Sequence, residues 1–433
     1  MTSPSPHALR SLKLARKRLS PPIGRRCGFA VVCLLLLASA SPAVDPREPE
    51  KMGEFAQDVA FLKQHTDVVV LRREGAAVAV APAYQGRVMT STVDHQQGAS
   101  FGWINRPVVK AGFLPEVERK GKIEERIYVF GGEDRFWLGP EGGQFSIYFK
   151  KDAPFDGDHW YTPAPIDTDA YEVVRQTDDR VVCQRAFSLV NYSGTKFDIE
   201  ATREVRLLED SALNELGVTL TAGVEAVAFE SVNTIKNTGP VAWKKETGLL
   251  SIWILGMYRA STESMVVIPY QQGDEAKLGP VVNDDYFGKA PPDRLTVGDG
   301  VVFFKADAGL RCKIGLSPQR AKPLLGSYDS AGGTLTLVSY THHPGEQDYV
   351  NSAWELQDEP YRGDVVNSYT DDGNLGTFYE LESSSPALAL APGESATHVH
   401  RTLHLQGSKQ QLDEIARKTL GVGLDAIDKA FTE

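Results

Sequence analysis

The chain has 433 residues, of which 42% are hydrophobic, and this is enough to bury a sizeable core. Its formal net charge is −11, and an acidic chain repels phosphate backbones and anionic lipid surfaces, which excludes nucleic acid as an expected partner. The 39 Gly and 25 Pro residues favour a protein with many turns.

The first 43 residues differ from the rest of the chain. They carry seven basic residues and no acidic one, and an apolar run over 29–37 is followed by small residues. A basic segment, a short apolar segment and a small-residue cleavage site predict a secretory signal peptide over 1–43. A retained anchor is the alternative, although the run is short for a membrane span. We therefore expect a periplasmic or extracellular protein with no membrane contact beyond the signal peptide.

A single domain is expected over 53–433, after a linker at 44–52. The domain is predicted to begin with a helix, because apolar residues recur at i, i+4 and i+7 from Phe55. It is predicted to end with another helix, because Ser408 and Gln411 match a capping box ahead of further apolar positions.

Short β-type runs fill the sequence between these helices, and clusters of Gly, Asp, Asn or Pro separate many of them. Many strands at such spacing favour a sandwich over an α/β fold, so the predicted fold class is all-β. The predicted strands include 67–71, 77–81, 87–93, 126–130, 145–149, 180–189, 197–207, 214–222, 301–305, 334–340 and 397–405.

Four long loops interrupt these strands, at 94–125, 150–170, 270–297 and 341–376. They are rich in Trp, Tyr, His, Asp and Asn. Structureless segments of this length inside a compact domain usually carry function. The loops therefore predict where the functional site lies.

Several common motifs are absent. There is no GxxxxGK[ST] loop, no GxGxxG after a strand, no GxSxG elbow and no HExxH. ATP use, dinucleotide redox chemistry, serine esterase activity and zinc protease activity are therefore not expected. No CxxC or paired Cys/His spacing predicts a structural zinc site. His398, His400 and His404 share one strand face at a metal-compatible spacing, with three neutral imidazoles as the favoured alternative. Cys183 and Cys312 would remain after cleavage, and either one disulfide or two buried thiols fits them.

Longer stretches carry a family resemblance. They are 131–143 (GGEDRFWLGPEGG), 285–289 (DYFGK), 313–315 (KIG), 349–355 (YVNSAWE), 363–369 (GDVVNSY), 378–386 (FYELESSSP) and 398–404. Together they resemble an uncharacterised family of exported bacterial proteins assigned to the galactose-mutarotase-like superfamily. This resemblance implies a β-supersandwich that binds a sugar in a groove across one concave sheet.

The resemblance also implies roles for two residues. In the aldose 1-epimerases of the superfamily, a Glu in a Leu-Glu-Thr-like pattern is the base and His residues act as acid. The segment Leu381-Glu382-Ser383 is similar to that pattern, which implies that Glu382 is the base. Arg135 is implied as a substrate-binding residue. No acid histidine is assigned by the resemblance, and fold alone does not fix a reaction.

Candidate acids follow from the residues themselves. Glu380 and Glu382 share one face of a strand about 7 Å apart, so they can act as acid and base, with a structural ion pair as the alternative. His159 and His342 lie in polar loops and are candidate proton donors, because His titrates nearest neutrality. Solvent-exposed loop histidines are the alternative for both.

Candidate binding residues lie in the same segments. Glu133, Arg135 and Trp137 follow a Gly-Gly bend, and an Arg can fork onto vicinal hydroxyls or a carboxylate. Trp160 and Trp354 are aromatic platforms suited to the C–H face of a sugar. Packing within a turn or a loop is the alternative for these residues.

A polar loop supplies three more candidates, Asp364, Asn367 and Tyr369, which are predicted to bind hydroxyl groups. With Asp371 and Asp372 nearby, the alternatives are Ca²⁺ binding through oxygen ligands and ordinary turn chemistry. No other cofactor is expected.

Three functions remain open from the sequence. The first is an enzyme with epimerase-like acid/base chemistry at the anomeric carbon of a sugar. The second is a glycoside hydrolase or polysaccharide lyase, and the third is a non-catalytic periplasmic carbohydrate-binding protein. The expected partner is a sugar or oligosaccharide in each case, and whether the protein is an enzyme is left open, as is its oligomeric state.

Overall fold

The computed structural model describes residues 52–113, 127–346 and 348–431. The predicted signal peptide and nearly all of the predicted linker lie outside these residues. Within the described ranges, no helix combines the length and apolarity that a membrane crossing requires.

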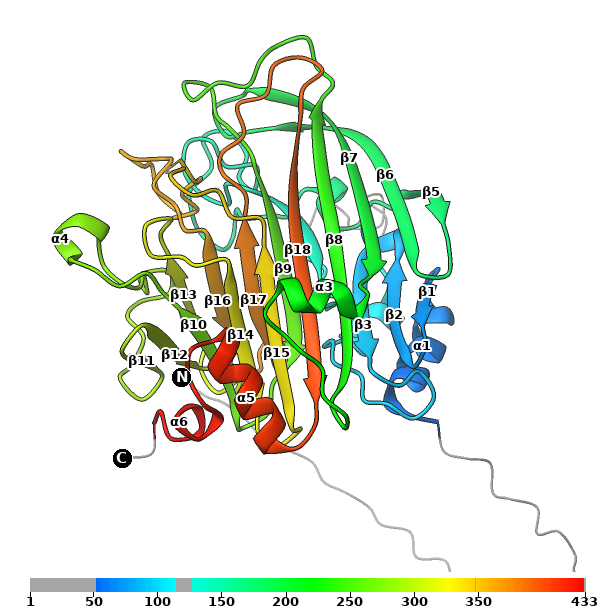
Figure 1. The fold of residues 1–433 in the computed structure, drawn as a ribbon. Helices are drawn as coiled ribbons and strands as arrows, with labels where there is room; N and C mark the ends of the chain where they lie inside the picture. The colour runs from blue at the N-terminus through cyan, green and yellow to red at the C-terminus, as the bar shows by residue number, and fades with distance from the viewer. Residues whose placement is uncertain (1–51, 114–126, 347, 432–433) are drawn as a thin grey trace, which may run out of the picture. The chain divides into compact units, whose positions relative to one another are not determined.

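The described strands form three antiparallel sheets (Figure 1). The three-stranded sheet has the order β1 (Val69–Arg73), β2 (Ala76–Ala81), β3 (Arg87–Thr92). The five-stranded sheet has the order β13 (Cys312–Leu316), β16 (Val366–Thr370), β17 (Phe378–Ser384), β9 (Ser251–Arg259), β4 (Arg135–Gly139). The ten-stranded sheet has the order β11 (Leu295–Val297), β12 (Val301–Lys305), β10 (Ser264–Pro269), β14 (Leu324–Asp329), β15 (Thr334–Tyr340), β18 (Ser395–Gln406), β8 (Glu225–Asn237), β7 (Lys196–Leu207), β6 (Arg180–Val190), β5 (Glu172–Gln176).

Short helices accompany the sheets. They are α1 (Glu54–Lys63), α2 (Arg106–Ala111), α3 (Asp210–Glu215), α4 (Glu275–Leu278), α5 (Lys409–Thr419) and α6 (Leu424–Asp428). The helices predicted at the two ends of the domain are confirmed as α1 and α5, and the capping box of Ser408 with Gln411 is present. The predicted all-β fold class with short helices near both ends is therefore confirmed.

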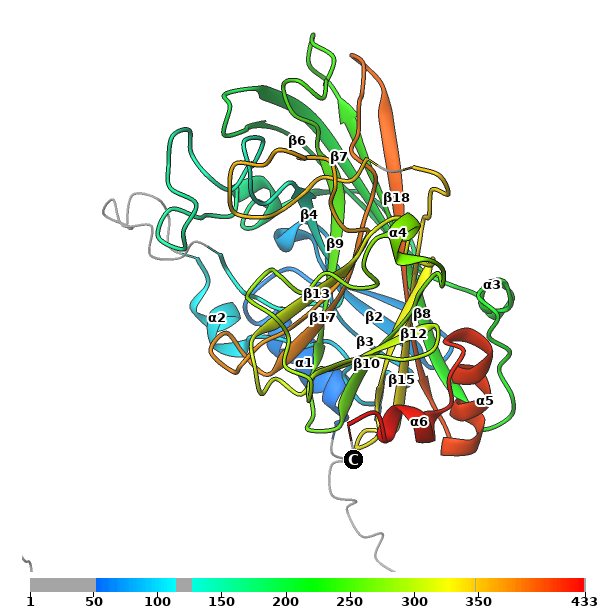
Figure 2. The ribbon, with the colours of Figure 1, turned by 90° about the vertical axis from the view of Figure 1, so that its left-hand side faces the viewer.

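The ten-stranded sheet is covered on both faces at its β10 end. On β10, Met265 and Val267 pack in a cluster with Leu412 of α5, whereas Val266 and Ile268 pack with residues of the five-stranded sheet. Side chains alternate along a strand, so covering both faces requires an unbroken apolar run. Figure 2 shows α5 and α6 on one side of β15 and β10, with β13 and β17 on the other.

Three predicted strands are wrong. Residues 145–149 are irregular although Ile147, Tyr148 and Phe149 are buried, because a short apolar run marks burial rather than extended pairing. Residues 214–222 contain the end of α3 and a turn at Gly217, whose φ is 80°. The described part of 126–130 makes no strand.

The two cysteines are free and buried. Cys183 lies on β6 of the ten-stranded sheet and Cys312 on β13 of the five-stranded sheet. Of the two alternatives that the sequence left open, the structure has the pair of thiols.

A polar layer lies between the five-stranded and ten-stranded sheets. The Ser383 hydroxyl is 2.8 Å from His398 Nε2 and 2.8 Å from His400 Nδ1, and both rings are fully buried. Burial lowers the pKa of each of these histidines to about 3. Both rings are therefore neutral in the folded protein at physiological pH.

Acid should destabilise the protein through these two rings. The ordinary histidine pKa of 6.5 lies above the folded value, so the folded state binds fewer protons than the unfolded state. The contribution of the two neutral rings to the free energy of unfolding is fully present above about pH 6.5. It falls as the pH drops toward 3, and the loss is roughly 2 kcal/mol per ring at pH 5. Urea unfolding from pH 7 to pH 4 measures this slope.

The matched comparison is His400→Gln against His65→Gln, because His65 is exposed. His400→Gln should reduce the slope by about one proton over this range, which is about 1.4 kcal/mol per pH unit. An unchanged slope in His400→Gln would show that this ring does not stay neutral.

Candidate functional site

The candidate site lies on the outer face of the five-stranded sheet, away from the ten-stranded sheet. Ser383 of β17 points inward to the two buried histidines, so the alternating neighbours Glu382 and Glu380 point outward. Across the paired strands of the sheet, Arg135 of β4 lies level with Glu382. Lys313 of β13 lies level with Glu380. Two carboxyl groups and two cations therefore share one face.

The two cations bond to the carboxyl groups diagonally. Lys313 Nζ donates to Glu382 Oε2 at 3.0 Å, and Arg135 Nη2 donates to Glu380 Oε1 at 3.1 Å. Trp253 Nε1 also donates to Glu382 Oε2, at 2.9 Å. All of these side chains are buried, and Glu382 is 0% exposed. These donors, one charged and one with a partial positive charge, stabilise negative charge on Glu382 Oε2 in a buried site.

Glu380 differs from Glu382 in protonation. Burial raises the pKa of Glu380 to about 8; the positive charge of Arg135 acts against this shift and the charge of Glu382 adds to it. Glu380 therefore keeps its proton at neutral pH. Two like charges on neighbouring buried groups are costly, and one proton in the pair removes that cost.

Aromatic rings surround the carboxyl groups. The guanidinium of Arg135 lies 4.1 Å from the centre of the Trp137 ring, and Lys313 Nζ lies 4.7 Å from that of Trp253. Trp137 packs edge-on against Trp253 with ring centres 5.4 Å apart. Further out, Trp160 and Trp354 stack with ring centres 6.0 Å apart. Trp137, Trp253, Trp160 and Trp354 together form an aromatic wall. Trp354 is 36% exposed, so this wall reaches the surface of the protein.

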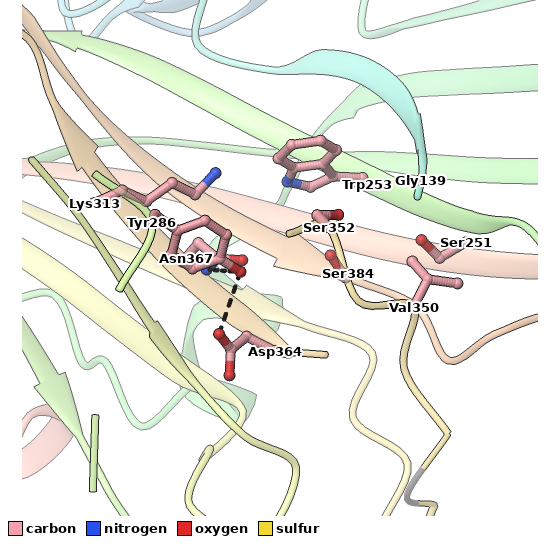
Figure 3. A pocket seen from close by; sticks show the side chains of 10 residues that line it. All are labelled: Gly139, Ser251, Trp253, Tyr286, Lys313, Val350, Ser352, Asp364, Asn367 and Ser384. Atoms are coloured by element: carbon pink, nitrogen blue, oxygen red, sulfur yellow. Dashed lines mark hydrogen bonds between the residues drawn. The ribbon is translucent and has the colours of Figure 1, made fainter. Parts of the chain in front are cut away.

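A small polar pocket adjoins the carboxyl groups (Figure 3). Tyr286 Oη donates to Asp364 Oδ2 at 3.3 Å on one side, and serine hydroxyls line the other. Trp253 and Lys313 belong to both the pocket and the contacts of Glu382. The lining residues are Gly139, Ser251, Trp253, Tyr286, Lys313, Val350, Ser352, Asp364, Asn367 and Ser384.

Most of the residues proposed from sequence lie together. Seven of them lie on the sheet face or at the pocket, and Trp160 and Trp354 form the outer wall. The seven are Arg135, Trp137, Asp364, Asn367, Tyr369, Glu380 and Glu382. Tyr369 is buried against Phe378, with a ring-centre distance of 5.9 Å. It is the residue of β16 that pairs with Glu380 of β17.

Three other candidates lie elsewhere. Glu133 lies between the sheets, where Oε2 is 3.0 Å from His404 Nε2 and accepts from the Ser91 hydroxyl. His159 is exposed and its Nδ1 is 2.7 Å from Asp156 Oδ1. His342 is partly buried beside Tyr340 and does not line the pocket. These three residues lie outside the proposed site.

Sequence reasoning did not assign four contributors to the site: Trp253, Tyr286, Lys313 and Glu141. It weighed Lys313 but favoured a surface lysine there, and the structure has it buried. Lys313 is 7% exposed, and its ion pair with Glu382 and its contact with the Trp253 ring account for a buried lysine on a strand. Burial raises the pKa of Glu141, while Lys313 acts against this shift and the charge of Glu382 adds to it. Three of the four lie in stretches quoted above, which was the available signal: Glu141 in GGEDRFWLGPEGG, Tyr286 in DYFGK and Lys313 in KIG.

The calcium alternative concerned the loop around Asp371 and Asp372. Asp371 Oδ1 accepts from the backbone of Leu375, and Asp372 Oδ1 accepts from the backbone of Asn374. These oxygens therefore satisfy their own turn. Across the described ranges, no group of three or more His, Cys, Asp or Glu side chains is arranged to hold a metal ion.

Residues 53–431 match the Family of unknown function (DUF6786), and the chain belongs to this family. The predicted membership of an uncharacterised family is therefore confirmed. No curated protein matches the chain.

Solved structures similar to the chain include three with low sequence identity. The Slr1438 protein of Synechocystis sp. PCC 6803 has a TM-score of 0.47 and 13% identity, over 79% of this chain and 96% of that one. A galactose mutarotase-like protein from Lactobacillus casei has a TM-score of 0.44 and 10% identity, over 78% and 100%. A putative aldose 1-epimerase from Escherichia coli K12 has a TM-score of 0.43 and 11% identity, over 79% and 99%. These likenesses concern the fold and assign no activity.

Removing one partner of the buried Lys313–Glu382 pair should be costly. Lys313→Met leaves an uncompensated buried carboxylate, and we expect a loss of about 3 kcal/mol in the free energy of unfolding. Combining it with Glu382→Gln removes both charges, so the double variant should lose less than the sum of the single losses. Urea unfolding of the four proteins measures this coupling.

An exposed ion pair serves as the control. Arg362 and Glu359 lie 3.1 Å apart with side chains that are 74% and 61% exposed. The equivalent variants of this pair, Arg362→Met and Glu359→Gln, should each change the free energy of unfolding by less than about 1 kcal/mol. Additive losses at Lys313 and Glu382 would contradict the buried pairing.

Proposed function

We propose that this protein is an exported, sugar-binding enzyme that interconverts the anomers of an aldose by acid/base chemistry. The observation that carries this proposal is the Glu380–Glu382 pair. Glu380 holds its proton at neutral pH, and Glu382 accepts hydrogen bonds from Lys313 and Trp253 that stabilise negative charge on it. Groups with opposite protonation on one surface are what a proton-transfer site requires.

The reaction follows from these protonation states. Glu382 accepts the proton of the hydroxyl at C1 while Glu380 donates its proton to the ring oxygen. The C1–O bond to the ring oxygen breaks as the C1 carbonyl forms, which leaves the open-chain aldehyde. Rotation about the C1–C2 bond turns the other carbonyl face to the ring hydroxyl. Closure reverses both proton transfers, so the two carboxyl groups return to their starting states.

The aromatic wall and the buried cations support sugar binding. Trp253 and Trp137 offer apolar ring surface beside the carboxyl groups, and sugar C–H groups pack well on such rings. Because Glu382 is 0% exposed, a sugar reaches it only after a covering group moves. Trp354 is the most exposed ring of the wall, and we propose that its displacement opens the site.

Glu141 favours a second candidate, glycoside hydrolysis. It follows β4 on a loop, whereas Glu382 lies on β17. Burial raises the pKa of Glu141, and the charge of Glu382 adds to this shift. Hydrolysis needs two carboxyl groups on either side of a glycosidic bond. A new reducing end released from an oligosaccharide would favour this reaction over anomer exchange.

Glu382→Gln should abolish turnover, because an amide cannot accept the proton. We expect a loss of about 100-fold or more in kcat. The measurement is proton NMR of anomer exchange, with the wild type first tested on neutral aldoses and oligosaccharides. Because Glu382→Gln leaves Lys313 without its carboxylate, the Lys313→Met/Glu382→Gln variant is measured alongside, with thermal unfolding of each.

The matched control is Glu215→Gln, since Glu215 is exposed at the end of α3. It should retain wild-type turnover. A folded Glu382→Gln variant with wild-type turnover would refute Glu382 as the base. Sugar binding without exchange by the wild type would instead favour a binding protein.

The rate should also fall on the alkaline side. Glu380 acts in its protonated form, and its folded pKa of about 8 lies above the ordinary value of 4.5. Turnover should therefore be lost as the pH rises through about 8, and the same titration removes the stability that the proton supplies. Glu380→Gln should lower the rate and lose this alkaline limb. A limb near pH 8 that persists in Glu380→Gln would assign it to another group.

A further inference from the structure

A loop between α4 and β11 docks on the edge of the five-stranded sheet. The backbone N–H of Asn283 donates to the Gly315 carbonyl at 2.8 Å, and that of Gly315 donates to the Asn283 carbonyl at 2.7 Å. Gly315 lies on β13, an edge strand of the sheet, and the unpaired backbone groups of an edge strand are available for such pairing. The docked loop brings Tyr286 to the outer face beside Lys313.

Polar side chains fix the hydroxyl end of Tyr286. The hydroxyl donates to Asp364 Oδ2 at 3.3 Å and accepts from Asn367 Nδ2 at 3.3 Å (Figure 3). Asp364 Oδ2 also accepts from Asn283 Nδ2 at 3.0 Å, so the carboxylate ties the loop at two residues. Gly315 leaves room for this cluster, because a Cβ atom there would overlap Asp364 Oδ2. A carboxylate outside the proposed reaction centre therefore sets the position of the Tyr286 ring.

The ring of Tyr286 borders the Lys313 ammonium. Lys313 Nζ lies 5.3 Å from the centre of the Tyr286 ring and 4.7 Å from that of the Trp253 ring. A lysine ammonium is a compact charge on a flexible stem, and aromatic faces attract it. Trp253 lies on β9 and bonds Glu382 through its indole N–H, whereas the place of Tyr286 depends on the loop. The two rings together confine the ammonium where it donates to Glu382.

We propose that Tyr286 and Asp364 are positioning residues of the proton-transfer site. Asp364 anchors the Tyr286 ring, and the ring holds the Lys313 ammonium on Glu382, the proposed base. This inference rests on the proposed function, because it concerns the group that accepts the proton. In this role both residues act through Lys313, and neither exchanges a proton with the sugar.

The ionised form of Asp364 supplies the anchor. Burial raises the pKa of Asp364 from 3.8 to about 6, while Asn283, Tyr286 and Lys313 act against this shift. The titratable groups that face Asp364 are Tyr286 of the loop and Lys313 of β13, and burial raises the pKa of Tyr286 well above its usual value. Asp364 is ionised above about pH 6, so the anchor is present there and is lost as the pH falls through about 6.

Tyr286→Phe tests the anchor because it keeps the ring and removes the hydroxyl. The variant should lower kcat for anomer exchange about tenfold and keep KM within about twofold, because a displaced catalytic group slows the reaction more than it weakens binding. Tyr361→Phe is the matched control: its ring is also partly buried, and its hydroxyl donates to the Lys245 carbonyl at 2.8 Å. The control should keep the wild-type kcat. A folded Tyr286→Phe variant with the wild-type kcat would overturn the positioning role.

Asp364→Asn tests the carboxylate, and it replaces Tyr286→Phe if thermal unfolding shows that the latter is not folded. Wild-type kcat should fall as the pH drops through about 6. The variant should lose this acid limb and keep the alkaline limb near pH 8 that Glu380 produces. Asp178→Asn, in the exposed turn between β5 and β6, should keep both limbs. A wild type without the acid limb, or a variant that retains it, would overturn the role of Asp364.

The Lys313 ammonium gives a readout that needs no substrate. NMR of protein labelled at the lysine side-chain nitrogen measures how fast the ammonium protons exchange with water, and the Lys313 signal is the one missing from Lys313→Met/Glu382→Gln. Exchange should accelerate at least about tenfold in Tyr286→Phe and Asp364→Asn, because a confined group is protected from water, and stay unchanged in Tyr361→Phe.

The two readouts separate the positioning role from the reaction. Unchanged ammonium exchange in folded Tyr286→Phe and Asp364→Asn would overturn the positioning role and leave the proposed reaction standing. No turnover of any sugar by the wild type, together with ammonium exchange that accelerates in these variants, would overturn the proposed reaction and retain the anchor of Lys313.

Discussion

The buried carboxylate of Glu382 is the constraint on which the candidate site depends. A charge with no exposed surface must be paired, and Lys313 and Trp253 supply a cation and a donor at 3.0 and 2.9 Å. These three residues lie on β17, β13 and β9, which the order of the five-stranded sheet brings within reach of one another. The sheet therefore stabilises negative charge on Glu382, while burial leaves its neighbour Glu380 holding a proton.

The two faces of the five-stranded sheet have opposite electrostatic character. The inner face meets neutral histidines and hydroxyls at Ser383, and burial keeps His398 and His400 uncharged. The outer face carries the pair of Lys313 with Glu382, and the protonated Glu380 beside Arg135. A strand such as β17 can serve both faces because its side chains alternate, so a reaction surface and a packed core share one backbone.

Local patterns in the sequence predicted the local features correctly. Alternation placed Glu380 and Glu382 on one face, and the capping box placed the start of α5. Partners distant in sequence were out of reach: Lys313 is 69 residues from Glu382 and Trp253 is 129 residues from it. Their meeting depends on sheet order, which no local spacing encodes.

The misplaced residues have physical reasons as well. Glu133 and Arg135 are two residues apart, yet only Arg135 belongs to β4, because the strand begins there and the preceding chain turns between the sheets. The apolar run at 145–149 shows burial without pairing. In both cases the residue types signalled a buried environment, while strand boundaries and sheet partners decided the direction of the side chains.

The most direct test of this account is a carboxyl titration of the resting protein. Infrared difference spectra, compared between wild type and Glu380→Gln, would follow the protonated Glu380 carboxyl from pH 5 to pH 9. A carboxyl pair that shares one proton predicts a protonated carboxyl band at neutral pH that disappears near pH 8 and is missing from the variant. A Glu380 carboxyl that is already ionised at neutral pH would contradict the one-proton pair on which the proposed chemistry depends.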